Sequence, residues 1–173
     1  MSDFFQNGIV TTRHNLKTRS LESLEAELHE FSSHSPMALI LPCLYSELAQ
    51  DALSNIIDTL NGATYLSHVV IGLDRATESE YRHALEYFSR LKITHTVLWN
   101  DGPRARELQN ELKQHSVAPT DLGKGCNVWY CFGFIQSLPD IKGVALHDCD
   151  ITTYDRALLA RLLYPVAHPQ FNY

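Results

Sequence analysis

The sequence predicts an α/β protein with a mainly parallel, Rossmann-like sheet flanked by helices. Short, continuously apolar runs of strand length alternate with longer segments whose apolar residues recur at helical spacing. Such runs are typical of parallel strands that are buried on both faces, and the alternation is typical of successive β-α units. The 173 residues contain no linker, internal repeat or charge block, so we expect a single domain over 1–173.

The first 60 residues predict an outer helix, a core strand and a second helix. Leucines at helical spacing in 21–28 lie among charged residues, which favours a surface helix. The run 37–41 is apolar throughout and stops at Pro42, which indicates a buried strand. The next segment predicts one continuous helix that ends at Asn61. Its apolar stripe consists of Leu48, Ala49, Ala52, Leu53, Ile56, Ile57 and Leu60.

Two further pairs of strand and helix follow the same scheme. The run 66–73 predicts a strand, and Thr77 with Glu80 forms a capping box that opens a helix. The run 96–99 predicts the next strand, and Pro103 suits the first position of the following helix. The residues expected to face inward are Tyr81, Ala84, Leu85, Phe88 and Leu91 on the first helix, and Ala105, Leu108 and Leu112 on the second.

The last part of the chain predicts a buried helix, a short strand and an amphipathic helix. Residues 128–138 are apolar almost all round, so we expect a helix deep in the fold. Trp99 and Trp129 are both expected in the core. Residues 144–146 predict a strand that ends just before His147. The stripe of the final helix is Leu158, Leu159, Leu162 and Leu163.

We therefore divide the chain into three parts. An N-terminal extension with the outer helix covers 1–35, a β-α core covers 36–150, and a helix with a tail covers 151–173. The tail from 165 onward is apolar and aromatic. We expect this tail to expose apolar surface that further sequence normally covers, or to dock against a second subunit in a homodimer.

Charge and hydropathy argue against several classes of protein. Fourteen Lys and Arg residues against twenty Asp and Glu give a net charge of −6, so we expect no nucleic-acid partner. No apolar run reaches the roughly 18 residues that a membrane span needs. The first residues lack the basic and apolar regions of a secretory signal, and we expect a cytoplasmic protein.

The four cysteines are expected to be reduced thiols. A zinc site could be drawn from Cys126, Cys131, Cys149 and His147, but no C-x-x-C pair exists and the spacing matches no common zinc finger. The sequence therefore disfavours a zinc site with these ligands.

Two carboxylates follow the last predicted strand, where ligands bind in open α/β sheets. Asp148 and Asp150 lie at i and i+2, so in an extended segment both side chains point the same way and can approach one cation. Hard cations such as Mg²⁺ or Mn²⁺ prefer carboxylate and phosphate oxygens. The alternative is a strand-end turn in which each carboxylate caps the next helix or is solvated.

The segment Gly123-Lys124-Gly125 is a second candidate. A lysine between two glycines combines a point charge with close backbone approach, and both suit a diphosphate. It is not a Walker motif, because Gly125 follows the lysine and position 118 is Ala. A loop with a solvated lysine is the alternative. No G-x-G-x-x-G turn and no G-x-S-x-G elbow occurs, so neither a dinucleotide site nor a serine hydrolase is favoured.

The order of these segments resembles the nucleotide-sugar-binding half of GT-A glycosyltransferases related to family 2. The likeness is closest to the retaining, glucosyl-3-phosphoglycerate synthase-like enzymes, over roughly 35–165. It rests on 39–47, 69–74, 123–125 and 146–150, in the family's order. The resemblance implies a GT-A fold and transfer of a sugar from a UDP-glucose-like or GDP-mannose-like donor to a small hydroxyl acceptor, for example of the phosphoglycerate type, with retention of the anomeric configuration.

The resemblance also implies roles for residues around the nucleoside. Pro42, Leu44 and Glu47 would contact the nucleoside, and Asp74 would lie near its base or ribose. The chain departs from the family's Ala, Asn and Glu at Cys43, Tyr45 and Ser46.

For the rest of the donor, the resemblance implies that Lys124, between Gly123 and Gly125, binds the diphosphate. Asp148 would bind the donor sugar or ribose, and Asp150 would be the principal ligand of Mg²⁺ or Mn²⁺, with Asp148 beside it. Asp148, Asp150 and Lys124 would carry the catalysis, because the metal and the lysine stabilise charge on the departing nucleoside diphosphate.

Two other interpretations stay open. A GT-A enzyme needs acceptor-side structure after its Asp-x-Asp strand, and only 151–173 follow here, so we expect the donor-binding part of a larger domain. Such a module could bind nucleotide without transfer. A sugar-nucleotide nucleotidyltransferase would also use a metal and an α/β sheet, but its Gly-rich signature before a lysine is not found near 40–42.

Overall fold

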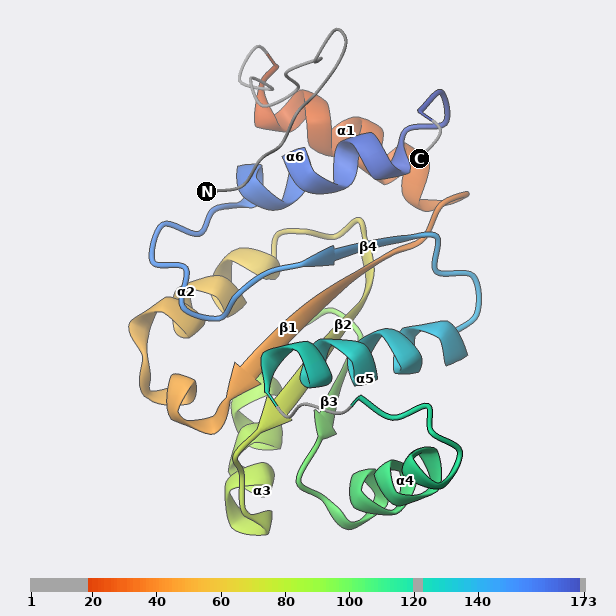
Figure 1. Cartoon of the computed structure of the whole chain (residues 1–173). Helices are drawn as coiled ribbons and strands as arrows, with labels where there is room; N and C mark the ends of the chain where they lie inside the picture. The colour runs from red at the N-terminus through yellow and green to blue at the C-terminus, as the bar shows by residue number, and fades with distance from the viewer. Residues whose placement is uncertain (1–18, 120–122, 172–173) are drawn as a thin grey trace, which may run out of the picture.

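The centre of the structure is a four-stranded parallel sheet. The computed structural model describes residues 19–119 and 123–171. The strands, in the spatial order β3-β2-β1-β4, are β1 (Met37–Leu44), β2 (Leu66–Asp74), β3 (His95–Trp99) and β4 (Gly143–Leu146) (Figure 1). Each neighbouring pair is parallel. The predicted α/β class with a parallel, Rossmann-like sheet is confirmed.

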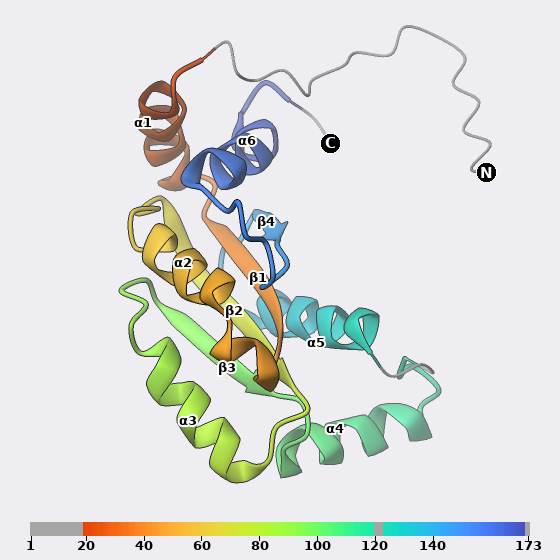
Figure 2. The same ribbon diagram turned by 90° about the vertical axis from the view of Figure 1, so that its left-hand side faces the viewer.

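Helices cover both faces of this sheet (Figure 2). On one side lie α2 and α3, and on the other lies α5, while α1 and α6 pack against each other beside the edge strand β4. The helices are α1 (Leu21–Ser32), the 3₁₀ helix η2 (Tyr45–Ala49), α2 (Asp51–Leu60), α3 (Glu78–Phe88), α4 (Pro103–Gln114), α5 (Lys124–Ser137) and α6 (Arg156–Ala167).

The connections reverse direction between β1 and β4. From β1 the chain passes through α2 to β2 and through α3 to β3, moving steadily away from β4. It then returns through α4 and α5 to β4, which pairs with the opposite edge of β1. In doubly wound sheets, the carboxyl ends of the strands at such a reversal form a crevice that binds ligands. The fold therefore places any ligand site beside the segments that follow β1 and β4.

Strand β1 separates two apolar cores. Leu39 and Leu41 belong to the larger core, with α1, α2, α3 and α6. Ala38 and Ile40 point to the other face, where they pack with Cys131 and other residues of α5 and β2. All four are fully buried. This two-sided burial is the reason that 37–41 is apolar throughout rather than alternating.

Several local signals in the sequence are confirmed. Thr77 and Glu80 form the predicted capping box, in which the Thr77 amide donates to the Glu80 carboxylate at 2.7 Å. Pro103 is the first residue of α4. The expected outer helix is α1, and its Leu24 and Leu28 are buried.

The helix that the sequence predicts over 48–60 is interrupted. Gln50 has extended backbone angles (φ −95°, ψ 139°), which separates η2 from α2. The carboxylate of Glu47 accepts a hydrogen bond from the Leu44 amide at 2.6 Å, which closes a short turn directly after β1. The apolar spacing continues across this break, and periodicity alone does not detect it.

Helices α4 and α5 are more exposed than the sequence predicts. On α5, which is not the deeply buried helix expected, only Asn127, Cys131 and Ile135 are buried. It packs on its face of the sheet through this narrow stripe, and its outer side meets solvent. Helix α4 follows the edge strand β3 and buries none of its residues. Residues expected inside but found exposed are Leu85, Leu108, Trp129 and Leu162.

The C-terminal part also differs from the prediction. Helix α6 includes Pro165 and continues to Ala167, so the tail is shorter than expected. Asn172 and Tyr173 lie outside the described residues, as do residues 1–18 of the predicted extension. None of the helices in 19–119 and 123–171 has the length and apolarity that crossing a bilayer requires. The homodimer and the cytoplasmic location stay predictions.

Candidate functional site

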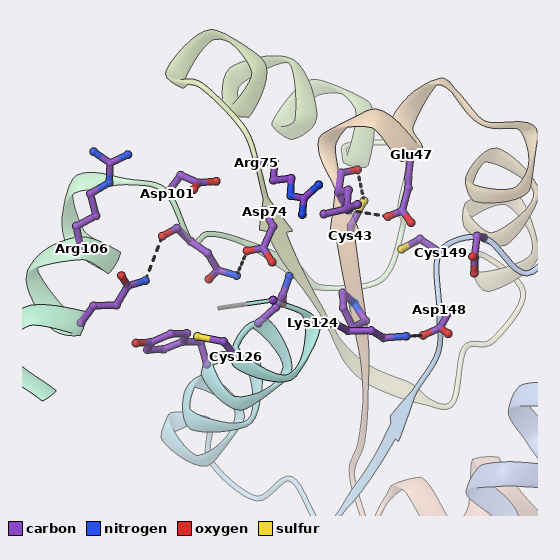
Figure 3. A pocket seen from close by; sticks show the side chains of 18 residues that line it. Cys43, Glu47, Asp74, Arg75, Asp101, Arg106, Lys124, Cys126, Asp148 and Cys149 are labelled. Carbon is purple, nitrogen blue, oxygen red and sulfur yellow. Dashed lines mark hydrogen bonds and ion pairs between the residues drawn. The ribbon is translucent and has the colours of Figure 1, made fainter. Parts of the chain in front are cut away.

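A pocket of about 680 Å³ opens at the carboxyl ends of β1, β2 and β4, against the start of α5 (Figure 3). It lies where the topology reverses. Of the residues selected from the sequence, Gly125 is exposed and outside the lining. The others all line the pocket: Pro42, Leu44, Glu47, Asp74, Gly123, Lys124, Asp148 and Asp150. The structure thus brings together residues that are up to 108 positions apart (150 − 42).

The first turn of α5 is anchored to the sheet by Asn127. Its buried side-chain amide donates to the carbonyl oxygen of Gly72 on β2 at 2.8 Å, and its Oδ1 accepts from the Cys131 thiol at 3.4 Å. A Cβ at Gly72 would stand only 1.8 Å from Asn127 Oδ1, so glycine is what allows this approach. Asn127 is not among the residues selected from the sequence, because an asparagine in an apolar helix carries no motif.

The backbone at Gly123 sets the direction in which α5 begins. Its φ of 132° lies in a region that only glycine adopts readily. The helix then starts at Lys124, and its unpaired backbone amides face the pocket with the positive end of the helix dipole. Lysine, helix dipole and backbone amides together form a site suited to a phosphate group.

On the opposite side, Asp148 and Asp150 both line the pocket but are not held on one extended strand. Strand β4 ends at Leu146, and Cys149 and Asp150 form a turn, so the two carboxylates follow the strand on a turn rather than on an extended segment. Lys124 Nζ forms an ion pair with Asp148 Oδ1. Asp150 is exposed and has no hydrogen bond or ion pair with another residue of the described ranges. Two carboxylates of this kind fit a hard divalent cation by the chemistry of their oxygen donors.

Asp74 forms a third acidic position, deeper in the pocket wall. Its Oδ1 accepts a hydrogen bond from Asn100 Nδ2 at 2.7 Å. Burial raises the pKa of this carboxyl, although hydrogen bonds from Asn100 and Asn127 act in the opposite direction. The neighbouring Asp101 accepts from the Ala76 amide at 3.1 Å, which joins the loops after β2 and β3.

Two residues of α4, Arg106 and Gln109, also line the pocket and were not selected from the sequence. Gln109 Nε2 donates to the carbonyl oxygen of Asn100 at 3.4 Å. In the sequence, these two residues look like any other polar residues on the solvent-exposed face of a helix. No sequence signal could therefore have distinguished them from their neighbours.

His147 lies directly before the carboxylate pair but is buried behind it, 3% exposed. Its Nδ1 shares a 2.8 Å hydrogen bond with the Tyr154 hydroxyl, while Nε2 is buried and unpartnered. Burial lowers the pKa of this imidazole to about 4, against a smaller opposing effect of Asp148. The ring is therefore neutral at physiological pH and positions the turn rather than titrating in the pocket.

Fold and pocket together define a doubly wound α/β domain with a cationic helix start facing carboxylates at its topological reversal. Two curated proteins named glucosyl-3-phosphoglycerate synthase are similar to the chain over essentially its whole length. The protein from Persephonella marina is 46% identical over 173 residues, and that from Methanococcoides burtonii is 40% identical over 172 residues. The likeness to this group that the motif order predicts is therefore confirmed.

These relatives are longer than the chain. The matches cover 100% and 99% of the chain but only 43% and 42% of the two relatives, so the chain spans less than half of their length. No protein-family model matches the chain.

The pKa of His147 makes a testable prediction for stability. Below pH 6.5 the unfolded imidazole binds a proton, whereas the folded one stays neutral down to about pH 4, so stability present above pH 6.5 is lost as the pH falls. His147→Asn keeps a polar atom near the Nδ1 position but cannot bind this proton. Between pH 7 and 4, its free energy of unfolding should therefore fall by up to about 3 kcal/mol less than that of the unchanged chain. Urea unfolding in metal-free buffer measures this, and equal pH slopes would contradict it.

Proposed function

We propose that the chain forms the donor-binding part of a glycosyltransferase, which transfers a sugar from a nucleoside-diphosphate sugar to a small hydroxyl acceptor of the phosphoglycerate type. The similarity to the two named synthases over the whole chain carries this proposal. The pocket supports it, because residues suited to phosphate and to a divalent cation face one another across the reversal of the sheet. The nucleotidyltransferase interpretation gains no support from these relatives.

In this proposal, Pro42, Leu44 and Glu47 at the end of β1 hold the nucleoside, and Asp74 lies near the base or ribose. Glu47 is suited to this because its hydrogen bond to the Leu44 amide fixes the turn after β1. Asp74 is less readily ionised than an exposed carboxyl, which favours a polar contact over an ion pair there.

Lys124 and the first amides of α5 bind the diphosphate, and Asp150 with Asp148 holds Mg²⁺ or Mn²⁺. When bound, this cation would neutralise charge on the departing nucleoside diphosphate. Before the donor arrives, Lys124 is paired with Asp148, and both side chains are about half exposed (57% and 45%). Exposed ion pairs contribute less than about 1 kcal/mol, so Lys124 can exchange Asp148 for phosphate at little cost.

No described residue is assigned to the acceptor. The chain spans less than half of the relatives' length, so donor binding rather than turnover is the property that tests the proposal on this chain. A module that binds the donor without transferring the sugar would show the same binding. Retention of the anomeric configuration rests on the resemblance alone.

Removal of the Asp150 charge tests the metal role directly. Asp150 has no partner among the residues described, so Asp150→Asn should leave the fold intact while weakening Mn²⁺-dependent binding of UDP-glucose or GDP-mannose by at least about tenfold, roughly 1.4 kcal/mol. Calorimetric titration with and without Mn²⁺ measures the effect.

The matched control is Asp140→Asn, an exposed aspartate in the loop beyond the far end of α5 with a φ of 68°, which asparagine also adopts. It should leave donor binding unchanged. Equal donor affinity for the unchanged chain and Asp150→Asn, both in Mn²⁺, would contradict the assignment.

Substitution of Gly125 tests whether the diphosphate lies over the start of α5. A Cβ added at Gly125 or at Gly133, both on α5, meets no atom of the chain within 4 Å. Both Gly→Ala changes should therefore be neutral or stabilising, by up to about 1 kcal/mol. Only Gly125→Ala should weaken donor binding, several-fold, because position 125 belongs to the first turn of α5, whose amides are proposed to bind the diphosphate, whereas position 133 lies two turns further along. Identical donor affinities for the two variants, by calorimetry, would place the diphosphate elsewhere.

A further inference from the structure

Two buried thiols and a carboxylate meet at the edge of the pocket, beside the residues assigned to the donor. Cys43 lies near the end of β1, Glu47 lies in η2, and Cys149 lies in the turn after β4. One ligand atom from each side chain lies within 4.8 Å of the other two. Figure 3 shows the Cys43 and Cys149 side chains facing each other from the two neighbouring strand ends, with Glu47 beside them.

We propose that Cys43, Glu47 and Cys149 form a binding site for a thiophilic divalent metal of the Zn²⁺ class, separate from the Asp148 and Asp150 position. Its sulfur donors select borderline and soft cations, whereas the two aspartates select hard ones such as Mg²⁺ and Mn²⁺. The pocket thus carries two adjacent cation positions with different selectivity.

The distances suit tetrahedral coordination after a small side-chain adjustment. With zinc-sulfur bonds of about 2.3 Å, two thiolates on one zinc ion lie about 3.8 Å apart. The three ligand atoms already lie within 4.8 Å of one another, so rotations of the side chains close the difference. Pairing of β1 with β4 supplies the framework, because Ile40 and Leu146 are register partners just before the two cysteines.

The site is both shielded and reachable. Cys43 and Cys149 are 1% and 2% exposed, which protects a metal-sulfur centre from bulk water. All three ligands line the pocket, so an ion enters from that side and a fourth position is left for water or a ligand in the pocket. One Glu47 oxygen accepts from the Leu44 amide, which orients the carboxylate and leaves the other oxygen for the metal.

The binding step balances without any redox partner. Each of the two S–H bonds is replaced by a sulfur-metal bond, the two protons pass to the buffer, and the Glu47 carboxylate binds as the anion. The bound metal would tie the turn that carries Asp148 and Asp150 to the end of β1, and so stabilise the folded chain. The other two cysteines are not ligands of this site. The Cys131 thiol donates a hydrogen bond to Asn127 on α5, and Cys126 lies on the same helix.

Titration of the reduced chain with Co²⁺, a spectroscopic substitute for Zn²⁺, tests this site. We expect one equivalent to produce a near-ultraviolet thiolate-to-Co²⁺ charge-transfer band that Zn²⁺ abolishes and that excess Mg²⁺ leaves in place. Cys43→Ser and Cys149→Ser should each weaken Co²⁺ binding by at least about tenfold, as should Glu47→Gln, which can still accept from the Leu44 amide. Cys126→Ser is the matched control and should bind Co²⁺ normally.

The Co²⁺ titration of the unchanged chain can contradict the proposal by itself, even where a cysteine variant does not fold. A Co²⁺ complex without thiolate absorption, or one that Mg²⁺ displaces, would place the metal on the aspartates. A thiolate band that survives in folded Cys43→Ser and Cys149→Ser but is lost in Cys126→Ser would assign the sulfur ligands to α5. Circular dichroism establishes that each variant is folded before its metal affinity is compared.

Discussion

The hydrogen bond between the Asn127 side chain and the Gly72 carbonyl is the contact on which the geometry of the pocket depends. It is buried, and loss of a partner for a buried amide costs about 1 to 3 kcal/mol. Because Gly72 has no Cβ, the helix approaches β2 closely enough for this bond to form. Lys124 lies three residues earlier, on the same face of the helix, and is thereby held where it reaches Asp148. One buried amide thus couples helix placement to the charge arrangement of the site.

The carboxyl edge of the sheet combines groups that would not be stable together in an apolar interior. Asp74 is half-buried and supported by amide donors, whereas Asp148 and Lys124 neutralise each other in partial contact with water. Asp150 stays exposed, and His147 is kept neutral by burial behind the turn. In the proposed function, this gradient from buried neutral groups to exposed charged groups would let the pocket accept phosphate and a cation without reorganising the core.

The sequence predicted the sheet well, because β1 and most of β2 are buried on both faces, and the helix-start signals Thr77 and Pro103 follow β2 and β3. It was less informative for α4 and α5, since apolar content does not reveal whether a second layer covers a helix; Trp129 is 43% exposed for that reason. The candidate residues at strand ends could be selected from the sequence, because the carboxyl ends of parallel strands lie together at one edge of the sheet. Contacts between distant positions, such as Cys43 with Cys149, have no local pattern and required the structure.

In the proposed function, one pocket, at the reversal between β1 and β4, receives the nucleoside diphosphate and its cation. The most direct measurement is a crystal structure of the chain with UDP and Mn²⁺, in which anomalous scattering locates the metal. We expect a manganese peak at Asp150 and Asp148, with the diphosphate over Lys124 and the first turn of α5. Nucleotide bound instead in the apolar hollow between β3, α4 and α5, with no manganese at the aspartates, would contradict it.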